Sequence, residues 1–121
     1  MAETTTPGND APAAGPAAGG LSPELRARMA LALDVDDLVQ AQRLARVLSP
    51  WFGVAKVGLE LFTAAGPDAV GAMLDAGFDV FLDLKLHDIP TTVGKAASVC
   101  GALGARYVTM HAQGGSAMLQ A

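Results

Sequence analysis

The sequence lacks several features that would place it in common classes of protein. Its 121 residues include a single cysteine, which excludes an internal disulfide and a thiolate metal cluster. No run of about 18 apolar residues occurs, so we expect no membrane-spanning helix and no membrane partner. Eight basic residues stand against 12 acidic residues, and the formal net charge of −4 disfavours a basic face that binds nucleic acid. The first residues lack the basic and apolar parts of a secretory signal, so we expect a cytoplasmic protein.

What the sequence does contain is enough apolar residues for one small domain. They make up 51% of the chain, and charged residues make up 17%. Residues 1–20 are mostly alanine, glycine, proline and threonine, which cannot anchor a core, and we predict a disordered tail there. Residues 21–121 are predicted to fold.

Short apolar runs alternate with amphipathic stretches along residues 29–121. Apolar residues recur at helical spacing in the stretches, and Cys100 falls among the core positions of the last of them. This alternation predicts a parallel sheet covered by helices. The predicted strands are residues 29–35, 52–58, 78–85 and 106–112, and the predicted helices include 36–49, 67–77 and 90–104.

The spacing of the predicted strands favours one α/β architecture over another. Strand starts near Met29, Gly53, Phe78 and Arg106 are 24, 25 and 28 residues apart, near the roughly 31 residues of each unit in a (β/α)8 TIM barrel of about 250 residues. A dinucleotide-binding fold would need a glycine-rich turn after the first strand, where this chain has Asp34-Val35-Asp36-Asp37. We therefore predict about the first four βα units of a TIM barrel, that is, its N-terminal half over residues 21–121.

Charged residues stand at the ends of the predicted strands. Asp34 and Lys56 lie near the ends of the first two, and Asp83 and Lys85 end the third. Carboxyl ends of strands form the active face of a (β/α)8 barrel, and a buried strand carries charge only where something compensates it. Asp83 and Lys85 are two residues apart, so they share one face of the strand. A lysine between carboxylates is a positioned general acid; the alternative is an ion pair that only closes the barrel end.

Other polar residues near these ends are ambiguous when taken alone. Asp88, Thr91 and Thr92 fit the first turn of the following helix. His87 is either solvent-facing or packed in its loop. His111, at the end of the fourth strand, fits a ligand contact and a structural histidine equally well.

The segment FLDLKLHDIPTTV, residues 81–93, resembles the signature of the orotidine 5'-phosphate decarboxylase family, Asp-x-Lys-x-x-Asp-Ile-Pro-x-Thr. ALDV at 32–35, KVGLELFTAAGP at 56–67 and VTMHAQGG at 108–115 resemble further segments of that family, in the same order and spacing. Asp-x-Lys-x-x-Asp alone is shared with other sugar-phosphate decarboxylases and aldolases. Ile89, Pro90 and Thr92, with Lys56-Val57-Gly58 upstream, make the resemblance specific.

The resemblance implies a homodimeric (β/α)8 barrel that converts orotidine 5'-phosphate to uridine 5'-phosphate and CO2 in pyrimidine biosynthesis, without metal or organic cofactor. It implies that Lys85 protonates the carbon left by CO2 and that Asp83 lies against the substrate carboxylate. It further implies that Lys56 bridges ribose and Asp83, and that Asp34 binds the ribose hydroxyls. Asp88 would reach into the partner subunit's site.

The same resemblance implies substrate contacts along the whole signature. Ile89 and Thr92 would line the pyrimidine and ribose end. The implied catalytic residues are Lys85, Asp83, Lys56 and Asp88. The implied substrate-binding residues are Asp34, Lys56, Asp83, Leu84, Lys85, Leu86, His87, Asp88, Ile89, Pro90, Thr91 and Thr92, and no metal ligand is expected.

The sequence stops where a fifth strand is expected, before the late strands that bind phosphate in such barrels, so we expect the 121-residue chain to be inactive by itself.

The sequence also leaves two other functions open. One alternative is a related magnesium-dependent sugar-phosphate decarboxylase or synthase, which Ile89, Pro90 and Thr92 disfavour. The other is a non-catalytic half-barrel.

Overall fold

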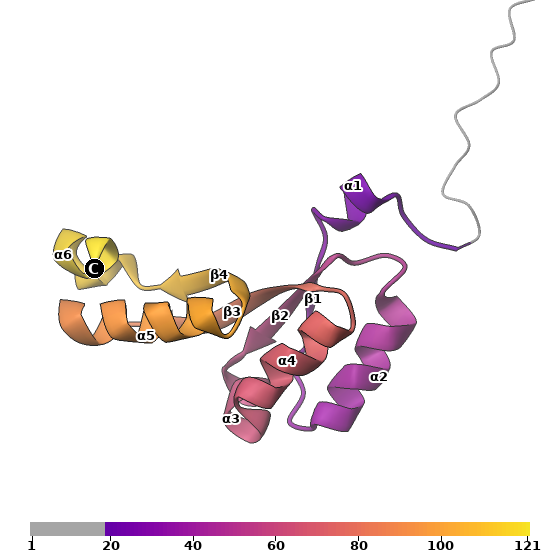
Figure 1. The fold of residues 1–121 in the computed structure, drawn as a ribbon, viewed down its shortest axis with the longest axis horizontal. Helices are drawn as coiled ribbons and strands as arrows, with labels where there is room; N and C mark the ends of the chain where they lie inside the picture. The colour runs from indigo at the N-terminus through magenta and orange to yellow at the C-terminus, as the bar shows by residue number, and fades with distance from the viewer. Residues whose placement is uncertain (1–18) are drawn as a thin grey trace, which may run out of the picture.

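The computed structural model of the chain describes residues 19–121 (Figure 1). The predicted disordered tail therefore lies, except for its last two residues, outside the described residues. The elements in chain order are α1 (Pro23–Arg26), β1 (Ala30–Ala32), α2 (Leu38–Leu48), β2 (Val54–Gly58), α3 (Leu59–Ala65), α4 (Pro67–Asp75), β3 (Asp79–Leu86), α5 (Pro90–Ala102), β4 (Ala105–Met110), the 3-10 helix η1 (Ala112–Gly114) and α6 (Ser116–Gln120).

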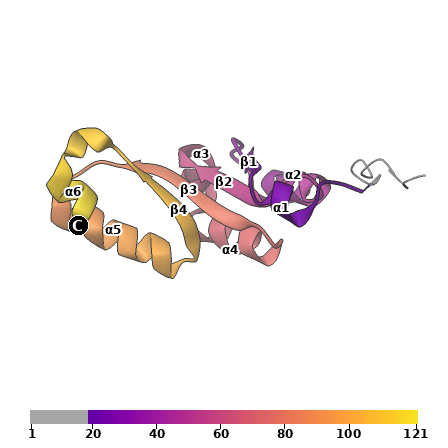
Figure 2. The ribbon, with the colours of Figure 1, turned by 90° about the horizontal axis from the view of Figure 1, so that it is seen from above.

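The four strands form one parallel sheet in the order β1-β2-β3-β4. Each strand is followed by helix, so the predicted alternation is confirmed; the short helices α1 and η1 were not expected. Figure 2 shows the sheet open, with β1 and β4 at its edges and the C-terminus beside α5 and α6. Neighbouring strands joined in sequence order by helical crossovers are the arrangement of the first units of a (β/α)8 barrel.

Local sequence explains where several helices begin. The side chain of Asp37 accepts a hydrogen bond from the backbone N–H of Gln40 at 2.7 Å, which caps the start of α2. Gly66 has a φ of 61°, a left-handed conformation that separates α3 from α4, and Pro67 then occupies the first position of α4.

Gly53 lies so close to α1 that a Cβ there would be 2.7 Å from the carbonyl oxygen of Arg26.

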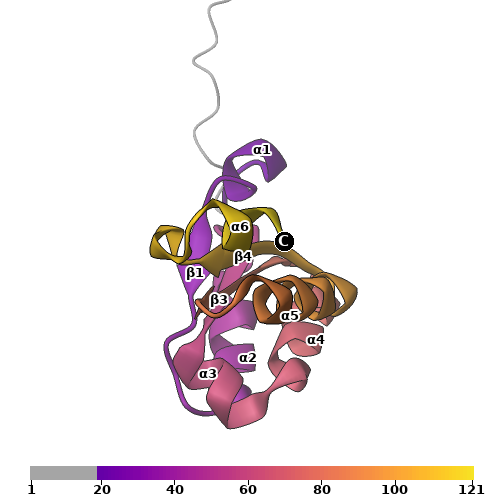
Figure 3. The same cartoon turned by 90° about the vertical axis from the view of Figure 1, so that its left-hand side faces the viewer.

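The core lies between one face of the sheet and the helices α2 to α5, which gather on the same side of the strands (Figure 3). Helix α2 contributes residues one turn apart, Ala41 and Ala45, and both are fully buried. Cys100 on α5 is buried as predicted, and burial raises the pKa of its thiol. The cluster consists of Leu33, Ala41, Ala45, Ala55, Val57, Leu61, Ala69, Val70, Met73, Phe78, Val80, Leu82 and Cys100.

Period-2 alternation sends the remaining strand residues to the opposite face of the sheet. Phe81 and Tyr107 meet there edge to face, with ring centroids 6.2 Å apart. A cavity of about 400 Å³ on this face is lined by Ala27, Arg28, Ala30, Val54, Phe81, Tyr107, Val108 and Thr109. Among residues 19–121, no helix is both long enough and apolar enough to cross a membrane.

Candidate active site

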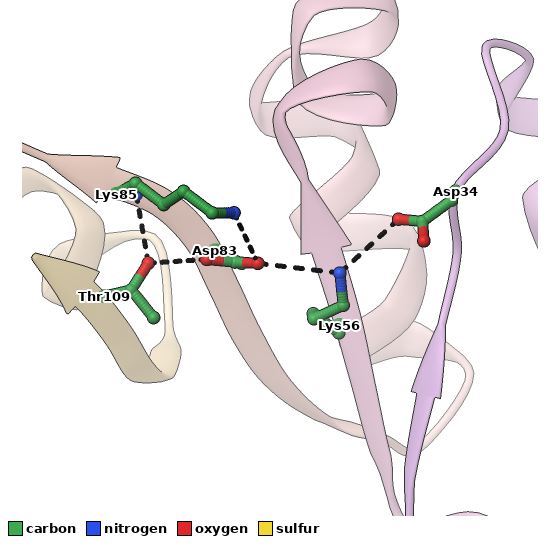
Figure 4. Close-up of polar contacts among 5 residues, drawn as sticks. All are labelled: Asp34, Lys56, Asp83, Lys85 and Thr109. Carbon is green, nitrogen blue, oxygen red and sulfur yellow. Dashed lines mark hydrogen bonds and ion pairs between the residues drawn. The ribbon is translucent and has the colours of Figure 1, made fainter.

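Four charged side chains from three adjacent strand ends form one continuous array (Figure 4). Lys56 on β2 lies between two carboxylates, with its Nζ 3.4 Å from Oδ1 of Asp34 and 3.5 Å from Oδ2 of Asp83. The Nζ of Lys85 lies 2.9 Å from the same Oδ2 of Asp83. The charges therefore alternate along the carboxyl edge of the sheet. The structure thus brings together the four charged residues expected at the ends of neighbouring strands.

Exposure falls toward the middle of this array. The Asp83 side chain is 12% exposed and that of Lys56 is 23% exposed, whereas Lys85 is 51% and Asp34 64% exposed. Asp83 is thus the fixed centre, and the outer two groups remain open to a ligand. A buried carboxylate is stable only when cations or hydrogen-bond donors compensate it, and Asp83 has both.

Asp83 is held in its charged form by its neighbours. The Thr109 hydroxyl donates to Oδ1 of Asp83 at 2.7 Å, and the Lys85 ammonium donates to Oδ2 at 2.9 Å. These two hydrogen bonds, followed by the charges of Lys85 and Lys56, hold the pKa of Asp83 below its usual value, while burial opposes them. The carboxylate is therefore ionised at neutral pH.

Lys85 reaches this position through an irregular backbone. Its φ of 52° is left-handed, and no other non-glycine residue within 19–121 has a positive φ. A left-handed non-glycine residue costs about 1 to 2 kcal/mol. The strain coincides with a break in the β3–β4 register, where Leu82 pairs with Val108 but Leu86 pairs with Met110. Bulges of this kind re-aim side chains beside active sites.

Thr109 is the residue of this site that sequence reasoning missed. It lies on β4 between the two paired positions, and its Oγ1 accepts a 3.0 Å hydrogen bond from the backbone N–H of Lys85. The available signal was weak: Thr109 is a polar residue between Val108 and Met110, on the strand that pairs with the strand bearing the signature. A threonine is common in strands for other reasons.

The loop after β3 places the rest of the signature at the start of α5. Oδ1 of Asp88 accepts a hydrogen bond from the backbone N–H of Ile89 at 2.6 Å, so this acid stabilises the local turn. Pro90 is the first residue of α5, and Thr91 and Thr92 occupy its exposed first turn. Residue Ile89 is 66% exposed, which leaves an apolar group available on this edge of the sheet.

The two histidines lie side by side at the ends of β3 and β4. The ring centroids of His87 and His111 are 5.1 Å apart, and both residues are exposed. The backbone N–H of His111 donates to the carbonyl of Leu86 at 2.9 Å, which joins the two loops. A cavity of about 530 Å³ next to them is lined by His87, Asp88, Ile89, Pro90, Gln113 and Gly114.

Two of the expected substrate contacts lie apart from the array. Leu84 packs against the hydrophobic core, on the face of β3 that the helices cover. Leu86 is half-buried at the end of β3, where its carbonyl accepts a hydrogen bond from the backbone N–H of His111.

Within the described residues, no three His, Cys, Asp or Glu side chains gather as a metal-binding group. The array thus offers two ammonium groups around an ionised carboxylate, which suits charge stabilisation and proton delivery.

Comparison with known sequences identifies the family of this chain. A sequence model described as "Orotidine 5'-phosphate decarboxylase / HUMPS family" matches residues 27–121. The chain belongs to this family. A curated relative from Moorella thermoacetica named orotidine 5'-phosphate decarboxylase is 52% identical over 94 residues, which are 78% of this chain and 37% of the relative. The chain thus spans about two fifths of the length of the decarboxylases it matches.

Solved structures of the decarboxylase family share the fold described above. The crystal structure of orotidine 5'-phosphate decarboxylase from Pyrococcus horikoshii superposes with a TM-score of 0.72 and 29% identity, over 75% of this chain and 44% of that one. The enzyme from Methanocaldococcus jannaschii in complex with the inhibitor BMP superposes with a TM-score of 0.71 and 26% sequence identity, over 76% of this chain and 43% of that one. The expected partial TIM barrel is confirmed by this likeness.

Proposed function

We propose that these residues supply the reacting groups of an orotidine 5'-phosphate decarboxylase, which releases CO2 from orotidine 5'-phosphate to give uridine 5'-phosphate. The observation that carries the proposal is the alternating array of Asp34, Lys56, Asp83 and Lys85 at the carboxyl edge of the sheet. The chain is 52% identical over 94 residues to a curated decarboxylase, and this similarity supports the same activity.

The proposed chemistry centres on Lys85. When the bond between the pyrimidine ring and its carboxylate breaks, the electron pair stays on the ring carbon as a poorly delocalised carbanion. A fixed cation beside that carbon stabilises the developing charge, and a proton must follow. The Lys85 ammonium provides both: it gives one proton to the ring carbon and is reprotonated from solvent. Its 2.9 Å bond to Asp83 fixes its place before the substrate arrives.

Asp83 is proposed to face the substrate carboxylate. Two like charges in a poorly hydrated site repel each other in the ground state, and the repulsion is relieved as neutral CO2 departs. The low exposure of Asp83 and its three polar neighbours keep its charge in place. Lys56 would then bridge the ribose and Asp83, and the more exposed Asp34 would bind the ribose hydroxyls.

The loop after β3 is proposed to complete the site from another direction. Ile89 and Thr92 would line the pyrimidine and ribose end, and His87, Pro90 and Thr91 lie in the same exposed loop and first turn. Asp88 is exposed, as it must be if it reaches into the site of a partner subunit in a homodimer. No metal or organic cofactor takes part in the proposed reaction, because the lysine ammonium provides the positive charge.

The proposed activity belongs to a protein of the relatives' length. In (β/α)8 barrels the phosphate site lies after strands 7 and 8, and phosphate binding energy contributes to transition-state stabilisation. Residues 1–121 span 37% of the Moorella thermoacetica relative. We therefore expect the 121-residue chain by itself to show no measurable turnover.

The test uses a completed protein, defined as residues 1–121 followed by the part of the Moorella thermoacetica relative beyond its 94 matched residues. The loss of absorbance as orotidine 5'-phosphate decarboxylates is followed for the completed protein, the 121-residue chain and the intact relative as positive control. Turnover by the completed protein, and its ability to restore growth without uracil in a host that lacks this enzyme, are the expected results. A folded completed protein without turnover would overturn the proposal.

A further inference from the structure

Thr109 makes two hydrogen bonds to the residues on which the proposed chemistry depends (Figure 4). We propose that Thr109 is a positioning residue for the decarboxylation, whose single hydroxyl holds Lys85 in its left-handed backbone conformation and aims the Asp83 carboxylate. This inference rests on the proposed function. It assigns Thr109 no contact with substrate; the residue acts through Asp83 and Lys85.

The register of the sheet puts Thr109 opposite the bulge. Leu82 pairs with Val108 and Leu86 pairs with Met110, so three residues of β3 face the single residue Thr109 on β4. An extra length of strand leaves its backbone groups without regular ladder partners. The N–H of Lys85 is one of these groups, and Oγ1 of Thr109 accepts its hydrogen bond at 3.0 Å. The side chain of Thr109 thus replaces a missing backbone partner.

The second bond fixes the direction of the hydroxyl. A hydroxyl has one hydrogen to donate and lone pairs to accept with. Since Oγ1 of Thr109 already accepts from the Lys85 N–H, its hydrogen is free to point at Oδ1 of Asp83, 2.7 Å away. The other carboxylate oxygen, Oδ2, receives the Lys85 ammonium at 2.9 Å. Backbone and side chain of Lys85 are therefore tied to the same Thr109–Asp83 pair.

This closed set of bonds predicts what loss of the hydroxyl does. Thr109→Val keeps the branched shape of the side chain but leaves the Lys85 N–H and one oxygen of Asp83 without their partner. The left-handed backbone of Lys85 then loses a stabilising hydrogen bond, and the Lys85 ammonium is no longer held in a single position. A displacement of about 1 Å at a reacting group lowers the rate by as much as 100-fold. Thr109→Ser keeps the hydroxyl and serves as the conservative variant.

The same loss changes the titration of Asp83. The Thr109 bond is the largest of the influences that lower the pKa of Asp83, so its removal raises that pKa. The charged groups that face Asp83 are Lys85 on its own strand and Lys56 on β2, with Asp34 beyond Lys56, and all remain in the variant. The acid limb of the kcat profile is expected to move to higher pH in Thr109→Val and to stay in place in Thr109→Ser.

The kinetic test compares four forms of the completed protein: wild type, Thr109→Val, Thr109→Ser and Thr63→Val. Thr63 is exposed on α3, so its substitution is the matched control for the same chemical change. We expect Thr109→Val to lower kcat about 10- to 100-fold with KM within about threefold, and Thr109→Ser to keep kcat within about threefold of wild type. If Thr109→Val does not fold, Thr109→Ala gives the same comparison.

A second readout does not depend on turnover. The carboxyl resonance of Asp83, assigned by its absence in Asp83→Asn, is titrated by NMR in each form together with the amide resonance of Lys85. A higher pKa of Asp83 and a shifted Lys85 amide in Thr109→Val only are the expected results. Unchanged kcat and unchanged pKa in Thr109→Val, or equal kcat losses in Thr109→Val and Thr109→Ser, overturn the positioning role. Absence of turnover in the wild-type completed protein overturns the proposed function instead, and the NMR titration then decides whether Thr109 holds Asp83.

Discussion

Lys85 and Asp83 lie two residues apart on β3, and their side chains meet at 2.9 Å. In a regular strand, residues at this spacing share a face but extend away from the sheet in parallel. The left-handed backbone of Lys85 bends its side chain toward Asp83 instead. The ammonium is thereby held beside a carboxylate while half of the side chain remains exposed to a ligand.

This relationship predicts the effect of removing the ammonium. Lys85→Ala in the completed protein should lower kcat by far more than tenfold, a cost well above about 1.4 kcal/mol, with a small change of KM. The reason is that the ammonium acts mainly on charge that develops in the transition state. Steady-state kinetics give both constants. Lys95→Ala, on the exposed side of α5, is the matched control and should keep wild-type kcat. A Lys85→Ala variant with more than about a tenth of the kcat would exclude Lys85 as the acid.

The lowered pKa of Asp83 predicts that the stability of the fold depends on pH. Its pKa in the folded chain lies below the ordinary value of 3.8, so its ionised form stabilises the folded state at all pH values above that. The stabilisation is lost as the pH falls below about 3.8 and through the lower pKa of the folded chain. Asp83→Asn should cost about 1 to 3 kcal/mol at pH 7 and less in acid, so its stability should vary less with pH in this range. Urea unfolding at a series of pH values measures this.

The control for this measurement is Asp36→Asn, which changes the same chemical group in an exposed loop. It should reproduce the wild-type dependence on pH. A steeper loss of stability in acid for Asp83→Asn than for wild type would contradict the sign of the pKa change.

Much of this architecture follows from the sequence because it depends on local pattern. Alternating apolar runs and helical stretches predicted all four strands and the helices between them, and charges at strand ends predicted the array of Asp34, Lys56, Asp83 and Lys85. The bulge at Lys85 did not follow, because it arises where β3 and β4 pair, and pairing between strands is not a local property. Thr109 was missed for the same reason, since its role depends on the residue that faces it.

The first predicted strand shows a different limit. The apolar run at 29–35 predicted seven residues, whereas β1 contains only Ala30–Ala32. Leu33 in this run is fully buried, but Met29, Ala30 and Ala32 are exposed, and an apolar run does not fix where ladder hydrogen bonds end.

The close contact between α1 and the start of β2 predicts a stability effect at Gly53. A Cβ at Gly53 would lie 2.7 Å from the carbonyl oxygen of Arg26, which already accepts the Gly53 N–H at 2.8 Å. Gly53→Ala should therefore destabilise the fold by about 1 to 3 kcal/mol. Gly71→Ala is the control, because a Cβ there meets nothing within 4 Å and a helical alanine adds up to about 1 kcal/mol of stability. Opposite shifts of the thermal midpoint are expected; equal shifts would place Gly53 away from α1.

The proposed chemistry predicts that turnover does not depend on a metal ion. The positive charge at the proposed reaction centre comes from Lys85, which lies 2.9 Å from Asp83 and needs no ion to hold it. Turnover of orotidine 5'-phosphate by the completed protein should therefore be unchanged in excess chelator, and added magnesium should not raise it. A magnesium-dependent enzyme assayed in parallel confirms that the chelator is effective. The magnesium-dependent sugar-phosphate enzymes are the alternative that this assay separates. Activity that disappears with chelator and returns with magnesium would favour that alternative and contradict a chemistry based on Lys85 alone.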